Sequence, residues 1–188
     1  PISTLGRSPL VLVAATQIGA SNIKDVVELG RRKPAAMSFG VSEASTRLAT
    51  EMISGATGVP MTAVNYKGTG PAMTDLAGGH VNFSVTTISS TLPMRGSGKF
   101  NYVGVLAAQR TPFLPDVPTL AELGYPQFEF SAWYALFAPA KTPADVSAKL
   151  SAALAKALKQ PEVTGKLGDF ISAAAAACRS GGATVAPR

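Results

Sequence analysis

The chain alternates between short apolar runs, typical of buried strands, and segments in which apolar residues recur at helical spacing. The strand-like runs lie at 9–15, 35–40, 61–66, 81–87, 100–108 and 128–140, and the helical patterns lie at 22–32, 44–54, 71–77 and 143–159. Gly55 is expected to close the helix at 44–54, as glycine often does at a helix end. Strands that alternate with helices predict an α/β fold with a largely parallel sheet.

Two segments near the carboxyl end of the chain differ in pattern. In the first, apolar residues recur every four positions on one face of the predicted helix, at Val146, Leu150, Leu154 and Leu158. Residues 171–188 are instead rich in Ala, Gly and Ser and show no such period. We interpret 171–188 as a disordered or non-native tail that carries no function.

Composition favours a packed protein without a nucleic-acid partner. Apolar residues make up 46% of the 188 positions and charged residues 15%, which is enough for a hydrophobic core. The net charge of +6 comes from scattered Lys and Arg residues that are not interleaved with stacking aromatics, so nucleic acid is not expected as a partner. No apolar run approaches the roughly 20 residues that span a bilayer, and no signal peptide is visible.

The residues that usually carry catalysis or bind metals are sparse. His80 is the only histidine, it lies in a GGHV turn, and the Gly-x-Ser-x-Gly motif of many hydrolases is absent. Cys178 is the only cysteine, which excludes an internal disulfide and a multi-cysteine metal site. No carboxylates cluster near His80 in the sequence. We therefore expect no enzyme activity, no metal and no cofactor.

Small and hydroxyl-bearing residues gather where a predicted strand is followed by a helix. The first such loop, SFGVSEAST at 38–46, contains Gly40, Ser42, Ser45 and Thr46. Free backbone N–H groups at a helix start favour a carboxylate or phosphate. Alternatively, Ser42 caps the helix and Glu43 complements its dipole. Glu43 would also repel a bound carboxylate.

Two further loops have similar chemistry. In YKGTGPA at 66–72, Lys67 offers a charge and Thr69 a hydroxyl, but Lys67 precedes the glycines, so the loop is not a P-loop. A structural turn explains this loop equally well. The third loop offers Thr86, Thr87, Ser89 and Ser90, which either orient polar ligand groups or cap the next helix. Ligands of such sheets bind beyond the carboxyl ends of the strands, where these loops are predicted.

Three long motifs make the chain resemble a known family. They are YKGTGPAMTDLAGGHVNF, LPDVPTLAELGYPQFEFSAWYALFAPAKTP and LSAALAKALKQPEV. In their order and spacing, over about residues 5–168, they resemble the substrate-binding proteins of tripartite tricarboxylate transporters, the Bug family. The resemblance implies a type II periplasmic-binding-protein-like fold, a periplasmic location and the membrane components of the transporter as partners. Its ligands are small carboxylates, commonly di- or tricarboxylates, held between two lobes.

The resemblance also implies ligand-binding positions. They are Gly40, Ser42, Ser45 and Thr46 in a carboxylate-holding loop, Tyr66, Lys67, Gly68 and Thr69 in the next motif, and Thr86, Thr87 and Ser89 after the following strand. Many relatives have an aspartate where this chain has Thr86, so recognition of a ligand amine is not expected here.

The resemblance further implies an incomplete pair of lobes. It assigns 15–97 to a complete second lobe, and 1–14 with 98–170 to crossing segments and a partial first lobe. The opening strand, loop and helix of the first lobe are not present in this sequence. Uncovered sheet edges and apolar faces would follow, and with them self-association or a domain swap.

The sequence therefore supports two functional hypotheses. The first is a periplasmic solute-binding protein that captures a small carboxylate for a tripartite transporter, with the identity of the carboxylate left open. The alternative is a truncated fragment of such a receptor, a structural or self-associating module without tight ligand binding. The effector domain of a regulator would need an adjoining DNA-binding helix-turn-helix, which this sequence does not contain.

Overall fold

The computed structural model describes residues 2–32 and 37–163 of the chain. These residues form two compact units. One spans Pro9–Ala132, and the other combines residues up to Ser8 with those from Trp133 onward. The tail predicted at 171–188 lies outside the described residues.

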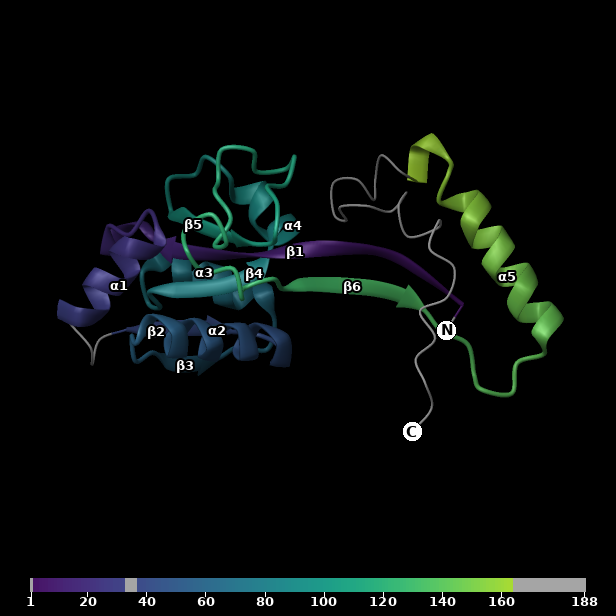
Figure 1. The fold of residues 1–188 in the computed structure, drawn as a ribbon, viewed down its shortest axis with the longest axis horizontal. Helices are drawn as coiled ribbons and strands as arrows, with labels where there is room; N and C mark the ends of the chain where they lie inside the picture. Colours follow the sequence, from purple (N-terminus) through teal and green to yellow (C-terminus); the bar gives the residue numbers. More distant parts are fainter. Residues whose placement is uncertain (1, 33–36, 164–188) are drawn as a thin grey trace. The chain divides into compact units, whose positions relative to one another are not determined.

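A mixed sheet forms the centre of the Pro9–Ala132 unit (Figure 1). Its strands are β1 (Ser3–Ala15), β2 (Ser38–Val41), β3 (Thr62–Asn65), β4 (Phe83–Thr87) and β5 (Phe100–Leu106), in the spatial order β3-β2-β4-β1-β5. β2 is parallel to β3 and β4, whereas β1 is antiparallel to β4 and β5. The prediction of a largely parallel sheet was wrong for β1, because the apolar pattern of a buried strand does not encode its direction.

Helices cover both faces of this sheet. They are α1 (Ile23–Arg32), α2 (Ala44–Thr57), α3 (Thr69–Gly78) and α4 (Ile88–Thr91), with the short 3-10 turns η1 (Thr16–Ile18) and η3 (Leu92–Met94). Leu10, Leu12 and Ala14 of β1 pack with buried residues of α1 and α2. Val11, Val13 and Ala15 pack with those of α3 and α4. The continuous apolar run of β1 follows from burial on both sides.

The end of α2 differs from the predicted end. The helix runs through Gly55 and closes at Gly58, whose backbone has a φ of 66° in the left-handed region. Glycine adopts this conformation without the steric cost that a side chain imposes, so Gly58 is the terminating residue. Gly55 lies inside the helix, and nothing lies within 4 Å of the position that an added Cβ would take.

The compact unit is also wider than the predicted lobe at 15–97. β1 precedes that range and β5 follows it, yet both are hydrogen-bonded members of the sheet. Leu10 of β1 pairs with Thr87 on one side and Leu106 on the other. Part of the range from 98 onward, expected as a crossing segment, therefore belongs to the same sheet. Pairings between positions this far apart in sequence leave no local signal, so the sequence did not indicate this.

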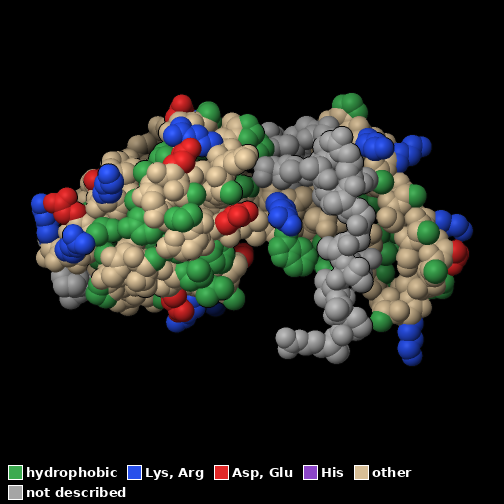
Figure 2. Space-filling view, in the orientation of Figure 1, with side chains coloured by type: hydrophobic (Ala, Val, Ile, Leu, Met, Phe, Trp, Pro, Cys, Tyr) green, Lys and Arg blue, Asp and Glu red, His purple; other side chains and the backbone are tan. Residues whose placement is uncertain are grey.

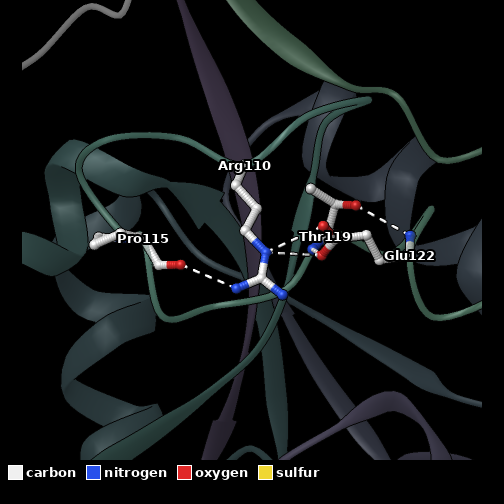
Figure 3. A network of polar contacts seen from close by, with 4 residues as sticks. All are labelled: Arg110, Pro115, Thr119 and Glu122. Atoms are coloured by element: carbon white, nitrogen blue, oxygen red, sulfur yellow. Dashed lines mark hydrogen bonds and ion pairs between the residues drawn. The ribbon is translucent and has the colours of Figure 1, made fainter.

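The Pro-rich connection after β5 is held by one polar network (Figure 3). The Nε of Arg110 donates to both carboxylate oxygens of Glu122 at 3.1 and 3.0 Å, and its Nη1 donates to the carbonyl of Pro115 at 3.1 Å. The backbone N–H of Thr119 also donates to Glu122, at 3.0 Å. Hydrogen bonds from Arg110 and then Thr119 hold the pKa of the Glu122 carboxyl below its ordinary value.

We expect Glu122→Gln to lower stability at pH 7 but not in acid. Because the folded-state pKa of Glu122 is lowered, its carboxylate stabilises the fold fully above its ordinary pKa of about 4.5. That contribution disappears as the pH falls through the lowered value. Urea unfolding of both proteins between pH 7 and pH 3 should show the difference narrowing to zero. Asp116→Asn is the control, since Asp116 makes only a 3.7 Å contact with Arg95. A difference that stays constant with pH would contradict the assignment.

The second unit has its own short pairing and helix. β6 (Ser131–Leu136) pairs with β1, and within this unit the N–H of Ile2 donates to the carbonyl of Leu136 at 2.8 Å. α5 (Ala144–Ala157) confirms the helix predicted at 143–159. Many apolar side chains here are exposed, with Trp133 at 61% and Phe137 at 58%. The predicted apolar stripe on α5 is exposed at Val146 and Leu150.

Candidate functional site

The carboxyl ends of three parallel strands meet at one edge of the sheet. β2 lies between β3 and β4, with Val41 level with Asn65 and Gly40 level with Ser84. The loops that follow these strands therefore start side by side. This arrangement brings together the three loops that the sequence singled out.

The first two loops touch through their hydroxyl groups. Ser42 follows β2 and Thr69 is the first residue of α3, and their Oγ and Oγ1 atoms lie 3.4 Å apart. Both residues are half-buried. Because α2 begins at Ala44, the contact sets the starts of α2 and α3 next to each other. The partial positive charges of two helix N-termini therefore act on the same place.

The first turn of α2 is capped from within by Thr46. The buried Thr46 hydroxyl accepts from the N–H of Ser42 at 3.4 Å and from the N–H of Glu43 at 3.2 Å. It donates its hydrogen to the carbonyl of Glu43 at 2.9 Å. The N-cap residue is Glu43, so the alternative in which Ser42 caps the helix was wrong. Thr46 uses its only hydroxyl hydrogen inside its own loop.

Four backbone N–H groups at these helix starts remain available. Those of Ala44 and Ser45 in α2, and of Thr69 and Gly70 in α3, have no hydrogen-bond partner within the part of the chain that the structure describes. Ala44, Ser45 and Gly70 are exposed. Unpaired N–H groups at a helix start attract anions, and two adjacent starts offer more donors than one.

The two charged residues of these loops lie at the surface. Lys67 and the N-cap residue Glu43 are both exposed. Gly68 is the N-cap of α3. Each of these two loops thus carries one charged side chain, negative in the first and positive in the second, and both are exposed to solvent.

Tyr66 is held by the helix that follows it. Its hydroxyl donates to Oδ2 of Asp75 in α3 at 2.7 Å. Burial first, and then this hydrogen bond, raise the pKa of Tyr66 to about 12, so the phenol stays protonated at neutral pH. The ring also packs near Gly40, where an added Cβ would lie 3.4 Å from Cε2 of Tyr66. Tyr66 therefore positions α3 against β2.

Gly40 has a different surrounding from the one expected. The family resemblance implied that Gly40 is one of the ligand-binding positions. In the structure Gly40 is buried in β2, and a Cβ placed there would contact Tyr66, Val81 and Ala72. Its carbonyl accepts a hydrogen bond from the Ser84 hydroxyl at 2.9 Å. Packing between β2 and its neighbours explains the small residue at this position.

The third loop divides into one buried and several paired hydroxyls. Thr87, the N-cap of α4, shares hydrogen bonds with Ser89 at 3.0 Å and Ser90 at 2.8 Å. These hydroxyls bond to one another, and no side-chain hydrogen bond caps α4, so the capping alternative is not what the structure shows here. Thr86 is buried, and its hydroxyl has no partner among the described residues.

Two residues of this region escaped the sequence interpretation. Asp75 accepts a hydrogen bond from Tyr66, nine positions earlier in the chain. The Ser84 hydroxyl in β4 donates a hydrogen bond to the carbonyl of Gly40 in β2.

The capping role of Thr46 had a signal in the sequence. Glu43 and Thr46 have the spacing of a capping box, with its usual residue types reversed. The partners of Asp75 and Ser84 depend on tertiary contacts and had no local signal.

The described ranges contain neither a candidate metal site nor a candidate membrane-spanning helix. There, no three His, Cys, Asp or Glu side chains group closely enough to hold a metal ion. None of the helices described combines the length and apolar character of a membrane span. On the face shown in Figure 2, Lys and Arg side chains are dispersed and form no single basic patch.

Comparison with known proteins gives one family for most of the chain. Residues 1–176 match the family described as tripartite tricarboxylate transporter family receptor. Protein BugT of Bordetella pertussis (strain Tohama I) is 32% identical over 165 residues, which are 87% of this chain and 51% of BugT. The chain spans about half the length of the curated relatives it matches.

Two solved structures are similar in both fold and sequence. R. palustris Rpa4515 with adipate gives a TM-score of 0.82 at 31% identity, over 89% of this chain and 56% of that chain. MatC (Rpa3494) from Rhodopseudomonas palustris with bound malate gives a TM-score of 0.82 at 30% identity, over 90% of this chain and 58% of that chain. The bound molecules of both neighbours are dicarboxylates.

Proposed function

The chain belongs to the tripartite tricarboxylate transporter receptor family, and on that premise we propose that it binds a small di- or tricarboxylate as a solute-binding protein. Its α/β fold is of the periplasmic-binding-protein type, as the resemblance implied. The expectation of a non-catalytic protein agrees with the description of the family as receptors. The periplasm as location and the membrane components of a tripartite transporter as partners are part of the proposal.

The free N–H groups at the starts of α2 and α3 carry this proposal. Four donors converge on one edge of the sheet, next to the hydroxyls of Ser42 and Thr69. A carboxylate accepts several hydrogen bonds at once, so it matches such a set of donors. Adipate and malate in the neighbouring structures support the same chemical class. Glu43, the N-cap residue of α2, is exposed and acts against a bound anion, and solvent screens that repulsion.

Ala44→Pro tests the proposal by deleting one donor. Ala44 is the first residue of α2, where proline fits without breaking a helix. Glu43 before it has an extended backbone with φ −147° and ψ 160°, which a following proline requires. We expect affinity for malate or adipate to fall roughly tenfold, the effect of losing one hydrogen bond to a charged group. Isothermal titration calorimetry of the 188-residue chain measures it.

Ala144→Pro is the matched control. Ala144 opens α5 in the other compact unit, after Pro143 with ψ 144°, so it accepts proline for the same reason. Its affinity should equal that of the unmodified chain. Equal affinities for Ala44→Pro and Ala144→Pro would contradict a ligand at the start of α2.

The second candidate function is a structural fragment without tight ligand binding. The exposed side chains of Trp133 and Phe137 favour it, because apolar surface of this kind normally packs against further structure. A folded sample that gives no heat of binding with any mono-, di- or tricarboxylate would support this second function.

Self-association was predicted from the sequence. The comparisons lend it no support, and it stays a prediction.

A further inference from the structure

Glu43 is the one acidic side chain in the three loops of the candidate site. The loops at 38–46, 66–72 and 86–90 contain only one other charged residue, Lys67. Glu43 is exposed and is the N-cap of α2, directly before Ala44, whose N–H has no partner among the described residues. A carboxylate at a helix start stabilises the helix, but here it lies beside donors that an anionic ligand requires. Glu43 therefore affects which anions bind.

The local backbone keeps the Glu43 side chain near the start of α2. Glu43 is extended, with φ −147° and ψ 160°, and forms a capping box with Thr46. In a capping box the N-cap side chain turns back toward the N–H of the third helical residue. The free donors of α2, on Ala44 and Ser45, lie between these two residues in the chain. A carboxylate bound to them would have the charge of Glu43 as a near neighbour.

The charges at this edge of the sheet match about one carboxylate group. Lys67 balances Glu43 in formal charge, and Arg47 is already ion-paired with Glu51 at 3.0 Å. The attraction that remains comes from the starts of α2 and α3, each equivalent to about half a positive charge. Every further carboxylate of a ligand is repelled by Glu43, and these loops hold no second cation to offset it.

A separate observation points to a polar ligand at the same edge. Thr86 lies at the carboxyl end of β4, two residues after Ser84, which is level with Gly40 of the neighbouring strand β2. Its Oγ1 atom is buried and has no hydrogen-bond partner within residues 2–32 and 37–163. An unpaired buried hydroxyl calls for a partner that the chain itself does not supply. The charge of Glu43 thus acts at a place that is equipped to hold a polar molecule.

We propose that Glu43 is a specificity-determining residue of the carboxylate site: its negative charge disfavours tricarboxylates relative to dicarboxylates. This inference rests on the proposed function and narrows its class of ligands. The two helix starts bind one carboxylate group, and Glu43 repels each additional one. The effect depends on the charge of Glu43 alone, so replacement by the neutral and nearly isosteric glutamine removes it.

Glu43→Gln tests the proposal, with malate and citrate as probes at pH 8. Citrate is malate with one added carboxymethyl group, so the two acids differ by one carboxylate. In low salt, isothermal titration calorimetry should show a preference for malate over citrate that is roughly two- to fourfold smaller in Glu43→Gln, the effect of one extra unit charge at about 5–10 Å in water. In 1 M salt, where the Debye length is about 3 Å, the unmodified chain and the variant should have the same preference.

Two further variants separate the charge from its surroundings. Glu43→Asp keeps the charge and should keep the preference of the unmodified chain. Glu28→Gln removes an exposed carboxylate from α1, which precedes the amino end of β2, and should also leave the preference unchanged. An unchanged preference in Glu43→Gln, an equal change in Glu28→Gln, or a change that persists in 1 M salt would overturn the role of Glu43 alone. An unmodified chain that binds neither probe would instead overturn the proposed function together with it.

Discussion

Phe39→Ala is expected to lower the free energy of unfolding by about 3–5 kcal/mol. The Phe39 side chain is 0% exposed and belongs to the core cluster shared by the sheet, α1 and α2. Its ring centroid lies 6.1 Å from that of Phe83 on the neighbouring strand β4. Truncation removes buried apolar area and leaves a cavity between two strands. Since small domains are stable by only about 5–15 kcal/mol, a large share of the stability would be lost.

Urea unfolding followed by circular dichroism measures this loss. Leu48→Ala is the control: Leu48 lies on the outer face of α2 and is 53% exposed, so its truncation should change stability by no more than about 0.5 kcal/mol. A loss below about 1 kcal/mol for Phe39→Ala would show that the core around β2 is not packed as described.

Gly30→Ala is expected to lower the free energy of unfolding by about 1–3 kcal/mol, although alanine is the better helix former. A Cβ on Gly30 would lie 2.2 Å and 2.4 Å from the two γ-carbons of Val59 and 2.8 Å from its Cβ. Rotation of the Val59 side chain can move its γ-carbons, but its Cβ stays 2.8 Å from the added Cβ, still too close for two carbon atoms. α1 must therefore shift away from the segment that leads into β3.

Gly55→Ala separates this steric effect from helix propensity. Gly55 also lies inside a helix, but nothing lies within 4 Å of the position where its Cβ would be. Here the change should raise stability by about 0.5–1 kcal/mol. Thermal or urea unfolding of both variants should thus give shifts of opposite sign. Shifts of the same sign would refute the close approach of α1 to Val59.

The order of strands and helices was predictable because each element has a local pattern. Apolar runs such as 9–15 and the four-residue period of 143–159 depend only on neighbouring positions. The direction of β1 and the inclusion of β5 depend on contacts across more than 70 positions, as in the pairing of Leu10 with Thr87. No local pattern encodes such contacts, so the sheet was predicted largely parallel and the antiparallel direction of β1 was missed.

The sequence predicted where the candidate site lies in the fold better than it predicted the contacts of each residue there. The sequence placed the loops at 38–46 and 66–72 beyond the carboxyl ends of strands, and in the structure Ser42 and Thr69 of these loops lie 3.4 Å apart. The roles of individual residues became clear only from the folded structure. Thr46 caps its own loop, Gly40 packs beneath Tyr66, and Thr86 is distinguished only by burial without a partner. Burial and pairing are properties of the folded chain, so residue type alone could not assign them.

The hydroxyl of Thr46 has a consequence for the thermodynamics of recognition. It fixes the N–H groups of Ser42 and Glu43 before any solute arrives, so the strand-to-helix turn is already in one conformation. A preorganised turn loses little backbone entropy when an anion docks. Association at this edge should then be governed by desolvation of the acid and of the exposed amides, and the heat of binding should depend strongly on the solute rather than on rearrangement of the loop.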